Sequence, residues 1–173
     1  MPLEIDDVIL PGNEKAFTVG TRTQANSIND LHPFYRSLLD KPVTAAVATI
    51  SENGQPQLTP NWCTHDGTYV YLNSVRGRLK DRNIRARPNV TIMLMNPENP
   101  YHWISIYGTV EQITEEDDPQ QGHLATESID ALSSKYLGTT PYPLRDPGGE
   151  IRVLYKVRPD QIMTFGAIPA EEK

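Results

Sequence analysis

Cysteine is almost absent from this chain, since Cys63 is the single one among 173 residues. One cysteine excludes an internal disulfide framework and is typical of proteins from reducing compartments. Long apolar runs are also lacking, and no segment approaches the length of a membrane-spanning helix. The first residues, Met1–Asp7, are acidic and lack the basic and apolar regions of a signal peptide. The sequence therefore predicts a cytoplasmic protein with no membrane partner.

The familiar catalytic and metal-binding motifs are missing as well. The four histidines are scattered and Cys63 stands alone, so no cluster has the spacing of metal ligands. No nucleophile elbow, Walker-type loop or dinucleotide fingerprint occurs. Cys63 is interpreted as a small buried hydrophobe, because no paired base stands out. With no catalytic set of its own, the protein is expected to use the chemistry of a bound cofactor, and no catalytic residue is assigned.

The overall charge is acidic, with 22 Asp and Glu against 16 Lys and Arg and a net charge of -6. Nucleic acid should repel such a chain, so no nucleic-acid partner is expected. Against this background, five arginines and one lysine lie between Arg76 and Arg87. A cationic cluster that follows a strand and opens a helix is suited to a small anion such as phosphate. The alternative is a solvated helix face, the ordinary environment of Lys and Arg.

Residue patterns predict a mainly β protein with a few helices. β-Branched and alternating runs indicate strands over residues 43–50, 55–63, 68–73, 90–95, 101–113, 151–157 and 161–165. Helices are expected over residues 31–39, 78–87 and from 114 to 137. Tight turns join the first three strands into a meander. Antiparallel strands with helices inserted between them favour a closed or split antiparallel β-barrel. Residues 1–28 lack a clear period and are expected to form an extended N-terminal arm, with one domain over residues 29–173.

Several caps and breaks refine this prediction. Asn29-Asp30 is expected to cap the first helix and Thr114 the last, while Gly138 should end the last one. Pro56 and Pro60 withhold hydrogen-bond donors, so their strand should be bulged or lie at a sheet edge. Gly108 is expected at a β-bulge.

The order of short motifs resembles a known family. The motifs are Pro60-Asn61-Trp62, Asp66-Gly67, Asn73-Ser74, Arg78-x-Lys80-x-x-Asn83-Ile84 and Pro88-Asn89-Val90. Their order and spacing over roughly residues 31–166 closely resemble the pyridoxamine 5'-phosphate oxidase-like proteins. Within that family, the chain is most similar to the branch that uses the deazaflavin coenzyme F420.

The resemblance implies a split antiparallel β-barrel of the FMN-binding split barrel type. It also implies a homodimer with cofactor sites at the subunit interface, and an F420-dependent oxidoreductase. Such an enzyme transfers a hydride from the reduced deazaflavin to an unsaturated small molecule.

The resemblance also assigns cofactor-binding residues. Ser74, Arg78 and Lys80 would hold the phosphate of the cofactor, with Asn73 beside them and Asn83 as a polar support. The strand Thr59-Pro60-Asn61-Trp62 would flank the ring system.

Two alternatives to this function stay open. The first is an FMN-dependent oxidoreductase on the same barrel, because FMN also presents a phosphate. The second is a carrier protein that binds a flavin, deazaflavin or haem without turnover. Two residues have simpler explanations too: Trp62 is equally well explained by core packing, and Ser74 by capping of the helix that follows it.

Overall fold

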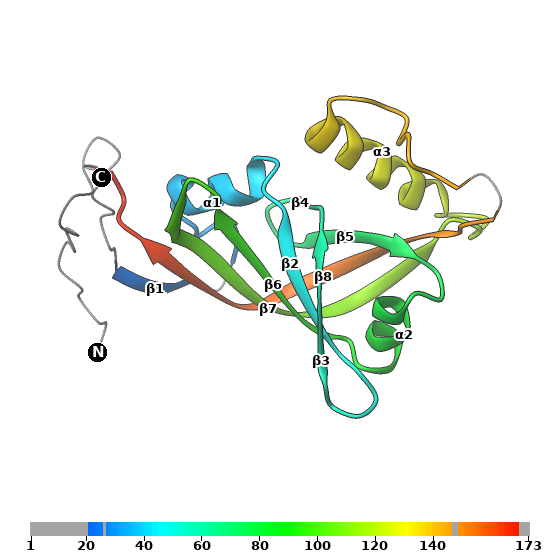
Figure 1. Ribbon diagram of the computed structural model, residues 1–173, viewed down its shortest axis with the longest axis horizontal. Helices are drawn as coiled ribbons and strands as arrows, with labels where there is room; N and C mark the ends of the chain where they lie inside the picture. The colour runs from blue at the N-terminus through cyan, green and yellow to red at the C-terminus, as the bar shows by residue number, and fades with distance from the viewer. Residues whose placement is uncertain (1–20, 26, 147–148, 170–173) are drawn as a thin grey trace.

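The computed structural model describes residues 21–25, 27–146 and 149–169. In these ranges one antiparallel sheet of eight strands has the order β3-β2-β6-β7-β8-β5-β4, with β1 also paired to β8 (Figure 1). The strands are β1 (Thr21–Ala25), β2 (Ala45–Ile50), β3 (Pro56–Asn61), β4 (Cys63–His65), β5 (Val70–Val75), β6 (Asn89–Asn96), β7 (Asn99–Glu115) and β8 (Arg152–Gly166). The sheet curls into a half-barrel, which confirms the predicted split antiparallel β-barrel.

The segment that contains β3 and β4 runs along both edges of the sheet. β3 pairs with β2 at one end of the strand order, and β4 pairs with β5 at the other end. The single strand predicted over residues 55–63 is therefore two strands that separate at Trp62. The predicted meander is wrong for the same reason, since β5 pairs with β4 and β8 instead of β3. Pro56 and Pro60 do lie on an edge strand, where a missing N–H is tolerated.

Three helices in the described ranges pack on this sheet: α1 (Pro33–Asp40), α2 (Leu79–Ala86) and α3 (His123–Leu137). α1 begins later than predicted, because Pro33 suits the first helical position and Nδ1 of His32 accepts a hydrogen bond from Phe34 N at 3.2 Å. The predicted cap at Asn29-Asp30 is therefore wrong. None of these helices is long and apolar enough to cross a bilayer.

The beginning of α3 also differs from the prediction. Thr114 does not cap a helix, because it pairs with Leu154 where β7 continues alongside β8. Long-range pairing with β8 outweighs the local helix signal of the acidic residues. The other end is as predicted: Gly138 ends the helix with φ 70°, a left-handed conformation that glycine adopts without strain.

β7 and β8 are the longest strands and connect the two ends of the half-barrel. The two strands predicted around Arg158-Pro159-Asp160 are one continuous strand, β8. Gly108 pairs with Pro159 while Tyr107 pairs with Gln161, so the register shifts at this point. The bulge predicted at Gly108 is confirmed, and it allows β8 to continue past its proline.

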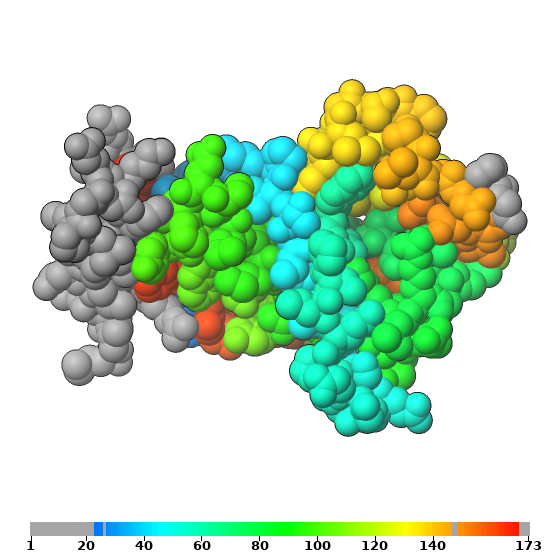
Figure 2. Space-filling model, viewed as in Figure 1, coloured from blue at the N-terminus to red at the C-terminus, as the bar shows by residue number. Residues whose placement is uncertain are grey.

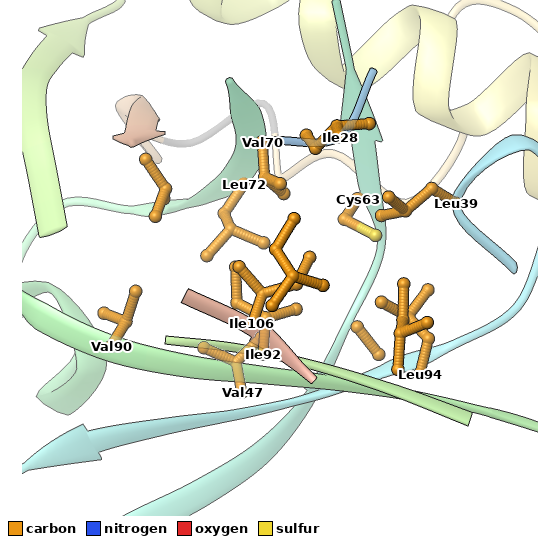
Figure 3. Packing of buried hydrophobic residues seen from close by; sticks show 14 of the residues in the cluster. Ile28, Leu39, Val47, Cys63, Val70, Leu72, Val90, Ile92, Leu94 and Ile106 are labelled. Carbon is orange, nitrogen blue, oxygen red and sulfur yellow. The ribbon is translucent and has the colours of Figure 1, made fainter. Parts of the chain in front are cut away.

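The hydrophobic core fills the concave side of the half-barrel (Figure 3). Ile92, Leu94 and Ile106 project into it from β6 and β7 and are fully buried. Burial of each such side chain stabilises the fold by about 1.5–3 kcal/mol. Cys63 is also fully buried here, as predicted, and this burial raises the pKa of its thiol.

Much of the predicted N-terminal arm, residues 1–20 and 26, lies outside the described residues. Its residues 21–25 form β1, which pairs with residues 162–166 of β8 in the same chain.

Candidate functional site

A cavity of about 480 Å³ opens between α3, the first turn of α2 and the segment that contains β3 and β4. Figure 2 shows this side of the molecule, hollowed between α3 in yellow and β3–β4 in teal. Eight of the nine residues predicted to bind a cofactor line it: Thr59, Pro60, Asn61, Trp62, Asn73, Ser74, Arg78 and Lys80. They come from three elements, and the curl of the sheet brings those elements together.

Lys80 is the most deeply placed cation of the predicted cluster. Only 8% of its surface is exposed, although it belongs to a short helix at the surface. Its Nζ donates a hydrogen bond to Oδ1 of Asn61. Burial, followed by the nearby charge of Arg78, lowers the pKa of Lys80 to about 8. An anion that entered the cavity would stabilise the charged form of this amine.

Asn61 connects the two edges of the half-barrel at the cavity. Its Nδ2 donates to the carbonyl oxygens of Trp62 at 2.7 Å and Asn73 at 3.3 Å. These bonds orient the amide so that Oδ1 faces Lys80. The end of β3 is thereby tied both to β5 and to α2.

Asn73 and Ser74 are buried near the end of β5, just before the basic segment. Nδ2 of Asn73 donates to the carbonyl of Ala125 at 3.1 Å, which leaves its Oδ1 buried without a partner. Oγ1 of Thr59 is also buried without a partner. Ser74 does not cap α2, because Arg78 occupies the N-cap position, so that simpler explanation is wrong.

Asn83 is the one predicted residue that does not line the cavity. It is buried one layer behind, where its Nδ2 donates to Oε1 of Gln57 and Oγ1 of Thr49, both at 3.1 Å. Gln57 itself lines the cavity. Asn83 therefore holds a lining residue in place and does not itself line the cavity.

The other arginines of the cluster are engaged elsewhere. Arg76 pairs with Glu115 and Asp117, and Arg85 pairs with Asp81 at 2.9 Å. Within the described part of the chain, Arg78 and Lys80 are the two members of the 76–87 cluster that line the cavity.

Arg78 stands at the mouth of the cavity. Its side chain is 59% exposed, and its Nη2 donates to Oε1 of Glu150 at 2.7 Å.

Aromatic rings form one wall of the cavity. The indole of Trp62 stacks on Tyr136 with 5.0 Å between ring centroids, and Tyr142 meets it edge-on at 5.9 Å. The hydroxyl of Tyr136 donates to the carbonyl of Val43 at 2.8 Å. Trp62 therefore packs against Tyr136 of α3 and also lines the cavity.

Several lining residues were missed from the sequence. Gln57, Tyr142 and Arg152 lie far apart in the chain, on β3, in the loop after α3 and at the start of β8, and meet only in the folded structure. One feature of the sequence could have pointed to Arg152: it is a charged residue at the start of a predicted strand, directly beside the apolar run Val153–Tyr155.

Comparison with known proteins identifies a family. The family model described as pyridoxamine 5'-phosphate oxidase matches residues 31–164. No curated protein matches the chain.

Solved structures give a consistent result. An F420 reductase is 32% identical, with a TM-score of 0.63 over 74% of this chain and 94% of that protein. Two others are alike in fold alone. A conserved hypothetical protein from Mycobacterium tuberculosis is 21% identical, with a TM-score of 0.61 over 75% of this chain and 81% of that one. A FAD-binding protein from Mesorhizobium loti is 18% identical, with a TM-score of 0.56 over 85% of this chain and 99% of that one. This chain belongs to the pyridoxamine 5'-phosphate oxidase-like family of split β-barrel proteins.

Proposed function

We propose that this protein is an F420-dependent oxidoreductase that reduces an unsaturated small molecule. The observation that carries the proposal is the cavity itself, which gathers Ser74, Arg78 and Lys80 beside the strand that contains Trp62. The 32% identity to a protein named F420 reductase supports the choice of the deazaflavin over other flavins.

The lining residues suit a flavin-type cofactor. The cavity volume of about 480 Å³ is ordinary for a small-molecule site. Oδ1 of Asn73 and Oγ1 of Thr59 are buried without hydrogen-bond partners. Buried polar atoms are nearly always paired in native proteins, so these two are candidates to bond polar atoms of a ligand.

The first task of the protein would be to hold the phosphate. Lys80 and Arg78 are donors and cations at the start of α2, and Ser74 would add a hydroxyl donor. Charge-assisted hydrogen bonds of this kind are about twice as strong as neutral ones. The phosphate would thus anchor the cofactor at the end of the cavity where the cations converge.

The second task would be to orient the ring system and exclude water. When bound, the reduced deazaflavin supplies the hydride. The protein would contribute the flat wall of Trp62 and Pro60, together with Ile129 and Leu132 of α3. Fixed orientation and exclusion of water are the main contributions that a protein makes when a cofactor carries the chemistry.

A titration distinguishes the cofactors. Purified protein should quench F420 fluorescence with a submicromolar dissociation constant and should show no comparable affinity for FMN. A yellow protein that retains FMN would overturn the deazaflavin assignment. Tight F420 binding without oxidation of the reduced cofactor by any of a panel of enones and quinones would indicate a carrier.

We also propose that the protein is a homodimer with its cofactor sites at the interface. The convex face of the sheet supports this proposal, because it carries a row of apolar side chains that pair across three strands: Met95, Trp103 and Phe165. The rings of Trp103 and Phe165 stack at 5.6 Å, and Met95 is exposed. A second copy would bury this row.

Sedimentation velocity tests the dimer. Met95→Glu should shift the protein toward the monomer and weaken F420 binding, because a charge in an apolar interface is costly. Glu52→Lys, in the exposed turn between β2 and β3, is the matched control and should change neither. A wild-type monomer that binds F420 fully would contradict the proposal.

A further inference from the structure

The cavity holds a third cation that the phosphate-binding set does not include. Arg152 is the first residue of β8 and pairs across the sheet with Val75. It lines the cavity with only 5% of its surface exposed. Burial of a guanidinium is unfavourable unless acceptors surround it.

The protein itself offers few acceptors to this side chain. Nη2 of Arg152 donates to Oε2 of Glu150 at 3.2 Å, while Nε is buried without a partner. Glu150 is shared, because its other oxygen accepts a hydrogen bond from Arg78 at 2.7 Å. Arg152 is therefore only partly satisfied by the protein.

The orientation of the guanidinium is restricted by an aromatic ring. Its central carbon lies 4.8 Å from the centroid of Tyr142, which covers one side of it. The backbone N–H of Tyr142 is in turn fixed by Oδ1 of Asp130 at 2.8 Å. A guanidinium held in this way is suited to a planar anion, and a carboxylate matches its two parallel donors.

The charge of the cavity leads to the same conclusion. Among the residues that the structure describes, its lining contains Arg78, Lys80 and Arg152 but no aspartate or glutamate. A phosphate held by Arg78 and Lys80 leaves Arg152 with no anion except the shared Glu150. An anionic group on a second molecule would complete the site.

We infer that Arg152 binds the carboxylate of the substrate, so the substrate class is small unsaturated carboxylic acids. The role of the bound acid as a substrate rests on the proposed function, whereas the carboxylate site depends on the residues of this chain alone.

Isothermal titration of trans-cinnamate and its methyl ester tests the inference on the full chain, without cofactor and with oxidised F420. The wild type should bind the acid at least tenfold more tightly than the ester. Arg152→Gln should remove this preference, and Arg152→Lys should retain part of it, because lysine keeps the charge without the planar fork. Arg145→Gln is the matched control: it removes an exposed arginine that pairs with Glu116 and should leave the preference unchanged.

Three results would overturn the inference. The wild type could bind acid and ester equally, or Arg152→Gln could leave the preference intact. F420 carries an acidic oligoglutamate tail, which gives the third result: Arg152→Gln weakens the binding of F420 but not the binding of a precursor without that tail or of cinnamate. This result would assign Arg152 to the tail of the cofactor. If Arg152→Gln does not fold, Arg152→Lys replaces it in the test: an unchanged preference for the acid over the ester in that variant would also overturn the inference.

Failure of the proposed function would look different. The wild type would then not bind F420, while its preference for the acid over the ester would persist in the cofactor-free titration.

Discussion

The ammonium group of Lys80 donates a hydrogen bond to Oδ1 of Asn61, which joins the first turn of α2 to the end of edge strand β3. The two residues are 19 positions apart, and both line the cavity. Since Nδ2 of Asn61 is occupied by backbone carbonyls, its Oδ1 is the atom left to receive Lys80. An arriving phosphate would find this amine already oriented.

Lys80→Ala should weaken F420 binding by about 1.5–3 kcal/mol, the usual cost of a lost charge-assisted hydrogen bond. Fluorescence titration measures this directly. Arg82→Ala is the matched control, because Arg82 is exposed and donates to the carbonyl of Gly77 without lining the cavity. An unchanged dissociation constant for Lys80→Ala would remove this residue from the site.

Binding of the cofactor phosphate should depend on pH through Lys80. Its pKa of about 8 means that the amine is charged below that pH and loses its charge above it. The affinity for F420 should therefore be steady below pH 8 and should decrease above it. In Lys80→Met this decrease should disappear. A wild-type affinity that stays constant to pH 9.5 would contradict the assignment.

Lys80 should also make the stability of the free protein depend on pH. The folded pKa, about 8, lies below the unfolded value of about 10.4. Between these values the unfolded chain binds more protons, so the free energy of unfolding should increase with pH across this window. Urea titrations give the free energy of unfolding of the wild type and of Lys80→Met. The difference between these two free energies should change from pH 8 to pH 10, and a constant difference would refute the low pKa of Lys80.

Tyr155→Phe should destabilise the fold by about 1.5–3 kcal/mol, the range for a hydrogen bond to a charged group. The hydroxyl of Tyr155 donates to Oδ1 of Asp81 at 2.8 Å, and both residues are buried. Urea unfolding at pH 7 measures the loss. Tyr69→Phe, on a partly exposed strand-end tyrosine, is the control and should have a smaller effect.

Asp81 should contribute to acid unfolding in a definite direction. Burial alone would raise its pKa, but hydrogen bonds from Gly77 N, Arg85 and Tyr155 lower it overall. Its contribution to stability is therefore present above the unfolded pKa, about 3.9, and is lost as the pH falls through the folded value. Asp81→Asn should flatten the acid limb of a plot of stability against pH, and an unaltered limb would argue against this network.

Tyr136→Phe should cost about 1–2 kcal/mol of stability while it preserves the stack on Trp62. Its hydroxyl donates to the carbonyl of Val43 at 2.8 Å and accepts from the N–H of Cys63 at 3.3 Å. Urea unfolding, followed by far-UV circular dichroism, gives the change. Tyr136→Leu removes the ring as well and should lose more stability than Tyr136→Phe. Equal losses of stability in the two variants would mean that the stack on Trp62 contributes nothing.

The candidate site was predictable where its residues are neighbours in the chain. Ser74, Arg78 and Lys80 follow one another at a strand-to-helix junction, and local motifs preserve such spacing. Charge alone could not show that Lys80 lines the cavity while Arg76 and Arg85 do not. In the structure these two arginines pair with acidic residues of β7, of the β7–α3 connection and of α2. That choice depends on which carboxylates the folded sheet brings near.

Misplaced boundaries have a similar origin. The acids after Thr114 are a sound local signal for a helix, yet β8 extends far enough to pair with Thr114 and Glu115. Pro159 looked like a strand end, but the bulge opposite Gly108 accommodates it. Local propensities are small, so many ladder hydrogen bonds outweigh them.

The sequence by itself determined most of the strands, the edge position of the proline-bearing strand and the basic turn that lines the cavity, because each of these depends on residues close together in the chain. It also determined the family, through the order of several short motifs. The tertiary structure alone decided that Gln57, Tyr142 and Arg152 share a cavity with Lys80, and that the strand after Pro56 divides at Trp62 to run along both edges. The physical reason is the curl of the sheet, since its register and curvature arise from pairing between distant segments.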